Sequence, residues 1–409
     1  MNTDTKLYSL YLNTIFFIYG LSMVLFDNAK YIKFIYLINV ILGLSFIYLV
    51  LSNKVKLQIN TFFKIYLLFV ILTITSSFWS DDFFYTARRS LNIVLIFLNI
   101  YFIYNINEKY KNFSYLIYGI FTALFVNFLW LLGIIDLGLT YEGWRFQGSV
   151  LQANNFVFIL MFAIMMVISL FILKQPTISN KFILIFILFI SAYMILFTAS
   201  KSGLFSSFLL LFFFALQATT FKNSFKTLLV ILFIYILLSY TPLLDLLAEN
   251  STLDLSYTLK NLFHRLEVFT VSLQAGASSG GSTGDRIMMI NDAINLWATS
   301  PIIGNGLAAF EQIYGHYSHN NMTELLASFG IVGFVLYYSL YVYLFIEIKS
   351  IEEWKIKIMF TLFLILFIFF DQSIVSYTGK FKILSFVILF LLIKEYKLSK
   401  NKVTSHAKN

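Results

Sequence analysis

The feature that most constrains this chain is a series of apolar runs, each long enough to cross a lipid bilayer. A membrane-spanning helix needs about 20 mostly apolar residues. We therefore expect an all-α, polytopic membrane protein of about twelve transmembrane helices. The predicted spans lie near residues 7–26, 31–52, 61–79, 87–105, 113–135, 154–173, 182–198, 203–218, 227–245, 324–347, 357–370 and 379–394.

The charge content supports a membrane protein. Charged residues make up only 12% of the chain and hydrophobic residues 59%, with a mean hydropathy of +0.82. A soluble chain carries about 25% charged residues. So little charge cannot cover a water-facing surface, and lipid must be part of the solvent. The run 7–26 has no small-residue cleavage site and is followed by another long apolar run, so it predicts a span rather than a signal peptide.

The spacing of the spans predicts the domain organisation. A bundle of about nine spans (1–245) is followed by one large extracytoplasmic loop with short helices (246–323), which lies between spans 9 and 10. The C-terminal spans (324–395) and a basic tail (396–409) complete the chain. Inside the large loop, the Gly/Ser-rich stretch 275–284 predicts a flexible hinge.

The distribution of basic residues predicts the orientation. With both termini in the cytoplasm, 18 of the 29 Lys and Arg residues fall on the cytoplasmic side, as the positive-inside rule requires. The net charge of +9 is then mostly topological, and no nucleic-acid partner is needed to explain it. All 18 of these cations are Lys, whereas every Arg falls outside: Arg88, Arg89, Arg145, Arg265 and Arg286.

This separation of Lys from Arg predicts an anion site on the outer face. A guanidinium group offers a planar fork of donors that fits phosphate oxygens in bidentate fashion, whereas Lys acts as a point charge. The alternative is that Lys-rich codon usage and chance placed the five Arg residues outside. Metal binding is poorly supported, because the chain has no Cys, and His316 and His319 lack a carboxylate at ligand spacing.

The segment 284–338 contains the most informative pattern. Thr283 or Asp285 is placed to cap a helix from Arg286 to about Thr299. Its expected apolar stripe is Ile290, Ile294 and Trp297. Pro301, Gly304 and Gly306 then predict a turn.

A second helix start follows this turn. Asn321 and Glu324 have the spacing of a capping box, and Glu324 is more simply explained as a structural cap than as a catalytic acid. His319 and Asn320 precede the helix, where its dipole favours an anion. His319 is therefore a candidate general base, with an ordinary loop histidine as the alternative. His316 is expected to be an ordinary loop or interfacial histidine.

These residues resemble the signature of the O-antigen polymerase/ligase family. The resemblance rests on the Arg-bearing helix from Arg286, on SPIIGNGLAAF (300–310) and above all on HNNMTELLASFGIVGFVLYY (319–338). Upstream, three segments resemble further elements of the family: WRFQGSVLQANN (144–155), FTASKSGLFSS (197–207) and SSFWSDDF (76–83). Lys201 stands where the family usually has Arg, so the charge is kept but the bidentate geometry is not.

The resemblance implies a GT-C-like, metal-independent glycosyltransferase without cofactors, in the bacterial cytoplasmic (inner) membrane with its site on the extracytoplasmic side. Its donor is implied to be an oligosaccharide on undecaprenyl pyrophosphate, because nucleotide sugars are absent outside the cytoplasm. Arg286 and His319 are the expected catalytic residues, with supporting roles for Asn320, Asn321 and Glu324. The expected diphosphate ligands are Arg286, Lys201 and Arg145, with Arg88 and Arg89 as secondary candidates.

Three functions remain open from the sequence. A polymerase joins lipid-linked repeat units of a surface polysaccharide, such as O-antigen or capsule, and is the interpretation that we favour. A ligase transfers the finished glycan to another acceptor, such as the lipid A core of lipopolysaccharide. A glycolipid transporter or flippase is the alternative of a different class, but the spans carry almost no charge at their centres. Expected partners are the lipid-linked oligosaccharide, an acceptor glycan and the bilayer, with a flippase and a chain-length regulator as further candidates.

Overall fold

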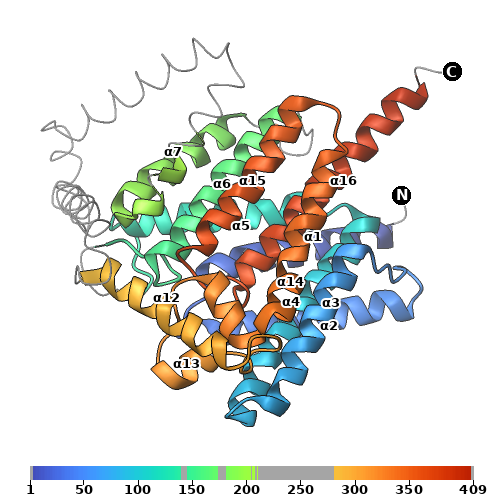
Figure 1. Ribbon diagram of the computed structural model, residues 1–409. Coiled ribbons are helices and arrows are strands. Elements are labelled where there is room, and N and C mark those ends of the chain that lie inside the picture. The colour runs from blue at the N-terminus through green and yellow to red at the C-terminus, as the bar shows by residue number, and fades with distance from the viewer. Residues whose placement is uncertain are drawn as a thin grey trace, which may run out of the picture. The chain divides into compact units, whose positions relative to one another are not determined.

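The computed structural model describes residues 3–139, 145–173, 181–203, 205–207, 210 and 281–406. These residues form helices and no strand (Figure 1). Two compact units are present, the first built from 1–38 and 112–270 and the second from 39–111 and 271–409. The helices are α1 (Thr3–Leu25), α2 (Ile32–Leu51), α3 (Thr61–Thr75), η1 (Ser76–Trp79), α4 (Phe83–Tyr110), α5 (Phe113–Leu131), α6 (Ala153–Leu173), α7 (Lys181–Thr198), α12 (Gly281–Thr299), α13 (Ala309–Tyr314), α14 (Asn321–Lys349), α15 (Trp354–Asp371) and α16 (Lys380–His406).

In the first unit, α1 and α5 pack against each other at two glycines. A Cβ atom at Gly20 would lie 2.2 Å from the carbonyl oxygen of Leu116, and one at Gly119 would lie 2.0 Å from that of Phe17. Small residues let two backbones approach this closely, which matters in lipid because the apolar environment gives helices little drive to associate. α6 packs against α7 in the same unit (Figure 1).

In the second unit, α14 is the helix around which the others pack. It contacts α3, α12, α13, α15 and α16. Aromatic rings fill the centre of this unit: Phe69 from α3 lies 5.6 Å from the ring of Phe329, 5.5 Å from Tyr337 and 6.2 Å from Tyr377, between centroids. Aromatic pairs of this geometry contribute about 0.5–1.5 kcal/mol each beyond the area that they bury.

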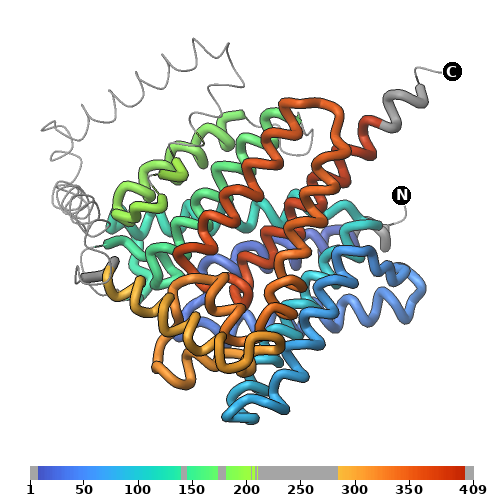
Figure 2. Tube along the Cα trace, in the orientation of Figure 1, coloured from blue at the N-terminus to red at the C-terminus, as the bar shows by residue number. Residues whose placement is uncertain are grey.

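Helix α14 is broken at Gly330, whose φ of 59° and ψ of −160° are not helical. The segment that joins α12 to α14, seen in Figure 2 as the tube leading into α14, supplies the backbone partners that the break leaves open. The amides of residues 305 and 306 donate to the carbonyl oxygens of residues 327 and 328, and the amides of residues 331 and 332 donate to those of residues 301 and 302, all at 2.9–3.1 Å. Unpaired backbone groups are costly at membrane depth, so a break is tolerated where protein pairs them.

Two glycines make this docking possible. A Cβ atom at Gly330 would lie 2.4 Å from the backbone of Ile302, and one at Gly304 would lie 2.3 Å from the amide nitrogen of Phe329. Both glycines also have positive φ, at 59° and 69°, which L side chains rarely adopt. The predicted turn at Gly304 is therefore confirmed, and it is packed against the broken helix.

The prediction of a multi-pass, all-α membrane protein is confirmed. Eight helices of the described residues are long and apolar enough to cross a membrane, namely α1 to α7 and α14, with η1 continuing α3. α15 and α16 are helical where the last two spans are predicted, but charged residues within them leave them outside this set. The span 227–245, most of 203–218 and residues 246–280 of the loop lie outside the described residues, so the number twelve and the loop position stay predictions.

Candidate functional site

The backbone around His319 is the starting point of the site. His319 lies directly before α14 with φ of 57°, a left-handed conformation that is uncommon outside glycine. The N-cap of α14 is Asn320, whose side-chain oxygen accepts from the amides of Met322 (2.9 Å) and Thr323 (3.1 Å). The expectation that Asn321 caps this helix is thus wrong by one residue, because the side chain of Asn321 is engaged elsewhere.

Glu324 has a structural partner different from the one expected. Its carboxylate accepts from the amide of Ser318 at 2.8 Å rather than from the cap residue, and its side chain is buried. Ser318 in turn donates through its hydroxyl to the carbonyl of Asn320 at 3.0 Å. Both contacts close the chain around His319, so Glu324 fixes the turn that presents the imidazole.

Helix α12 differs from its predicted form in two respects. It covers Gly281–Thr299, so Thr283 and Asp285 lie inside the helix instead of capping it, and the predicted hinge 275–284 is helical from Gly281. Gly284 is buried, and tertiary packing of this kind overrides the weak helix propensity of Gly, Ser and Thr. The predicted end of the helix at Thr299 is confirmed.

The face of α12 that packs inward is also not the predicted stripe. Met289, Ala293 and Leu296 pack with Phe310 of α13 and Ala327 of α14, whereas the side chain of Ile294, on the expected stripe, is exposed. Arg286, Met289, Ala293 and Leu296 follow a spacing of three and four residues, so they share one face of the helix. The packing of α12 therefore carries Arg286 toward the start of α14.

Arg286 and His319 are brought together in the second unit. Burial, then the charge of Arg286, then that of His316 lower the pKa of His319 from 6.5 to about 4. Burial also lowers the pKa of Arg286, while the neighbouring Tyr317 raises it. The ring of Tyr317 lies 4.3 Å from that of His319, between centroids, so one aromatic side chain adjoins both groups.

This arrangement keeps His319 neutral at neutral pH. A neutral imidazole has one nitrogen that accepts a proton and one that donates, and Nδ1 of His319 is buried without a hydrogen-bond partner among the described residues. Arg286 remains a cation in the same place. The pair can take a proton from one group and stabilise negative charge on another.

Asn320 and Asn321 are held by the segment between α15 and α16. Nδ2 of Asn320 donates to Oε1 of Gln372 at 3.1 Å. Oδ1 of Asn321 accepts from the amides of Ser376 at 2.7 Å and Tyr377 at 3.0 Å. Sequence reasoning missed the segment 371–377, although Asp371, Lys380 and Lys382 are the only charges in residues 358–393, and an isolated charge among apolar spans was a usable signal.

The segment 76–83 belongs to the same unit as His319. Oγ of Ser76 accepts from the amide of Leu307 at 3.2 Å, and a Cβ atom at Gly306 would lie 2.4 Å from that of Ser80. Asp82 caps α4 by accepting from the amide of Tyr85 at 2.9 Å. Three segments that resembled family elements, 76–83, 300–310 and 319–338, thus meet in one unit.

Arg88 and Arg89 differ in their surroundings. Arg89 forms an ion pair with Glu311 of α13 at 2.5 Å and donates to the hydroxyl of Tyr85 at 2.8 Å. Arg88 is exposed. The carboxylate of Glu311 already neutralises Arg89 and would compete with a diphosphate for its guanidinium group.

Arg145 and Lys201 lie in the first unit, near each other in its structure. Nε of Arg145 donates to the carbonyl of Thr198 at 2.8 Å, and the amide of Phe146 donates to that of Phe197 at 2.9 Å. Beside Lys201, Oγ of Ser200 donates to Oδ1 of Asn154 at 3.2 Å. Residues 145–155 and 197–203 are therefore joined by hydrogen bonds at the end of α7.

No group of three or more His, Cys, Asp or Glu side chains within the described part of the chain is arranged to hold a metal ion. The expected independence from metal stays a prediction, which a chelator tests.

A comparison with known families matches residues 186–338 to the Wzy_C family, described as O-antigen ligase. The match includes Lys201, Arg286, His319 and Glu324. No curated protein matches the chain. Residues 186–338 are therefore similar to the O-antigen ligase family, in agreement with the resemblance to O-antigen polymerases and ligases seen in the sequence.

Proposed function

We propose that this protein polymerises a surface polysaccharide by joining oligosaccharide repeat units carried on undecaprenyl pyrophosphate, at the outer face of the cytoplasmic membrane. The similarity of residues 186–338 to the O-antigen ligase family supports a surface-polysaccharide ligase or polymerase. The observation that carries the transfer chemistry of this proposal is the pairing of a half-buried arginine, Arg286, with a neutral histidine, His319.

The transfer reaction requires a cation at the leaving group and a general base at the acceptor hydroxyl. The acceptor hydroxyl oxygen forms a bond to the anomeric carbon of the donor sugar, while the bond from that carbon to the phosphate oxygen breaks. The electron pair leaves with the lipid diphosphate, whose growing charge Arg286 stabilises. The hydroxyl proton goes to His319, which acts as general base.

Neutrality of His319 suits this role. A base must be unprotonated at the working pH, and a pKa of about 4 keeps the imidazole free for the proton at neutral pH. The low pKa also makes the imidazole a weaker base than free histidine, so part of the drive must come from stabilisation of the leaving group. We propose Arg145 and Lys201 as further diphosphate ligands.

The test is a reaction of the purified protein with an undecaprenyl-diphosphate oligosaccharide as sole substrate, with and without a metal chelator. Longer glycans should appear in both arms. Arg286→Ala and His319→Ala should each lower the rate by about a hundredfold or more, while membrane insertion persists. Lys400→Ala, at the far end of α16, is the matched control and should keep the wild-type rate. Either site variant working at the wild-type rate contradicts the proposal.

A ligase is the second candidate, because the matched family is described as O-antigen ligase. A polymerase extends glycans from the lipid-linked donor alone, whereas a ligase needs an added acceptor. In cells, loss of a polymerase leaves single repeat units on the final acceptor, and loss of a ligase leaves full-length glycan on the lipid carrier. A flippase would move the lipid-linked donor across vesicles without changing its covalent structure.

A further inference from the structure

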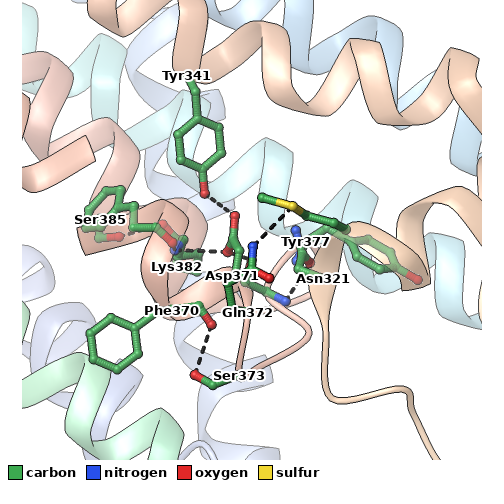
Figure 3. A network of polar contacts seen from close by, with 12 residues as sticks. Asn321, Tyr341, Phe370, Asp371, Gln372, Ser373, Tyr377, Lys382 and Ser385 are labelled. Carbon is green, nitrogen blue, oxygen red and sulfur yellow. Dashed lines mark hydrogen bonds and ion pairs between the residues drawn. The ribbon is translucent and has the colours of Figure 1, made fainter. Parts of the chain in front are cut away.

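The second unit contains a buried ion pair close to His319 in the fold. Asp371, the last residue of α15, and Lys382, in the first turn of α16, lie 3.2 Å apart between Oδ1 and Nζ, with side chains 0% and 2% exposed. Figure 3 shows Lys382 and Tyr341 reaching the same carboxylate from two different helices. Charges in such surroundings are expensive to bury, so they mark a position where geometry matters.

Each oxygen of the Asp371 carboxylate has specified partners. Oδ1 accepts from Oγ of Ser376 at 2.5 Å in addition to Lys382. Oδ2 accepts from the hydroxyls of Tyr341 at 2.5 Å and Tyr338 at 3.2 Å. Nζ of Lys382 also donates to the carbonyl of Phe367 at 2.8 Å. A network with all its members satisfied specifies one arrangement of α14, α15 and α16.

This network continues to the residues that follow His319. Nδ2 of Asn321 donates to the hydroxyl of Tyr338 at 3.4 Å, and Oδ1 of Asn321 accepts from the backbone of Ser376, itself a partner of Asp371. Gln372, next to Asp371 in the chain, accepts from Asn320. Both residues after His319 are therefore held by the segment that the ion pair anchors.

His319 depends on its neighbours for its position. Its φ of 57° costs energy that the surroundings must supply. Nδ1 of the imidazole has no hydrogen-bond partner among the described residues, so it does not orient the ring. What fixes the ring is the contact with Tyr317 and the backbone on either side, which Glu324 holds before His319 and the segment 371–377 holds after it.

Stability alone does not account for the ion pair. Replacing a buried ion pair by apolar side chains of similar size is often neutral or stabilising, whereas one charged partner left alone is strongly destabilising. We propose that Asp371, together with Lys382, is a positioning residue for the transfer reaction, which acts through Asn321, Gln372 and Asn320 to hold His319 in place. This inference rests on the proposed function.

The test removes the charges as a pair. The double variant Asp371→Leu/Lys382→Met should insert and fold, with some loss of stability because the hydroxyls that donate to Asp371 lose their acceptor. Its kcat should fall at least about tenfold with KM little changed, because small displacements of a catalytic group are costly. The matched control, Glu347→Leu/Lys397→Met, applies the same substitutions to the half-buried pair toward the far end of α16 and should leave kcat unchanged.

A second readout does not depend on activity. The chain has four His residues, so the NMR signal of His319 in histidine-labelled protein can be assigned by its loss in His319→Gln. At fixed pH this signal should move in the double variant and stay in the control. Unchanged kcat together with an unmoved signal overturns the inference. A fully active His319→Ala contradicts the proposed function instead, and the NMR signal then still decides on positioning.

Gln372→Ala keeps the inference testable if the double variant fails to fold. Gln372 is exposed, so this change leaves no buried gap, and it removes the partner of Asn320 while the ion pair remains. We expect a several-fold loss in kcat, with KM kept, and a shifted His319 signal. Gln372→Glu, which keeps an acceptor for Asn320, should restore both. Wild-type behaviour of Gln372→Ala would overturn the inference in that case.

Discussion

Helix α16 is joined to the second unit by ion pairs at both of its ends, and the two ends differ. At its start, Lys382 meets Asp371 in a fully buried ion pair. Toward its other end, three lysines meet carboxylates of α4, α14 and the following loop at partly or fully exposed positions: Lys394 with Glu108 at 2.6 Å, Lys397 with Glu347 at 2.5 Å and Lys400 with Glu352 at 2.6 Å.

Burial changes how strongly a lysine–carboxylate ion pair holds its partners in place. Exposed pairs are screened by water and salt and can exchange partners at little cost. In the buried network, each charge has one set of partners, and losing one leaves the other uncompensated. The exposed end attaches a helix, whereas the buried end fixes the segment that holds Asn320 and Asn321.

The free energy of unfolding should respond most strongly when one lysine is removed at each end of α16. Lys382→Met should lower the free energy of unfolding by about 3–5 kcal/mol, because it leaves the Asp371 carboxylate buried and unpaired. Lys397→Met should cost only about 0–1 kcal/mol, as exposed pairs do. Denaturant unfolding in detergent micelles measures both. Equal losses of stability in the two variants would contradict the difference between the buried and the solvent-accessible ion pairs.

The next effect concerns the pKa of His319, which precedes α14. Because the positive charges of Arg286 and His316 disfavour the imidazolium, Arg286→Gln and His316→Gln should each raise the pKa of His319. Burial is the larger cause, so the pKa should stay below 6.5 in both variants, with the greater rise in Arg286→Gln. Titration of the labelled histidine by NMR gives the values without requiring activity.

The sign of the linked stability follows from the same shift. The pKa of His319 is about 4 in the folded state and about 6.5 in an unfolded chain. Between these values the unfolded state binds more protons, so the protein should lose stability as the pH falls from about 6.5 toward 4. His319→Gln should lose less over that range. A pKa of His319 near 6.5 in the wild type would contradict the burial that we assign to this site.

Much of the helical architecture was predictable because the length of an apolar run is a strong, local signal. Single residues can mislead, however: Asn321 has the right spacing to Glu324 for a capping box, yet Asn320 caps α14. The side chain of Asn321 finds better partners in the backbone of Ser376 and Tyr377. Those partners lie far away in sequence, so no local pattern could reveal them.

The candidate site was also predictable from the sequence only in part. His319 and Arg286 could be proposed as candidates from the sequence, because imidazole and guanidinium groups are common in catalytic sites and their segments resemble a known family. The pairing of Asp371 with Lys382 was missed, since it depends on how two helix ends meet. The break at Gly330 was also missed, because the segment 301–306 that pairs its backbone lies on another element. Tertiary contacts decided each of these features.

We expect the smallest effect at the most exposed ion pair of α16, between Lys400 and Glu352. The hydrogen bond between Lys400 and Glu352 lowers the pKa of Glu352 and raises that of Lys400, yet both side chains face solvent that competes for the same charges. Lys400→Ala should therefore leave melting temperature and transfer rate unchanged, at low salt and at 1 M salt alike, where screening acts within about 3 Å. A loss of activity in this variant would mean that the exposed end of α16 also sets the position of the site. Geometry would then pass along the whole helix rather than through the buried network at its start.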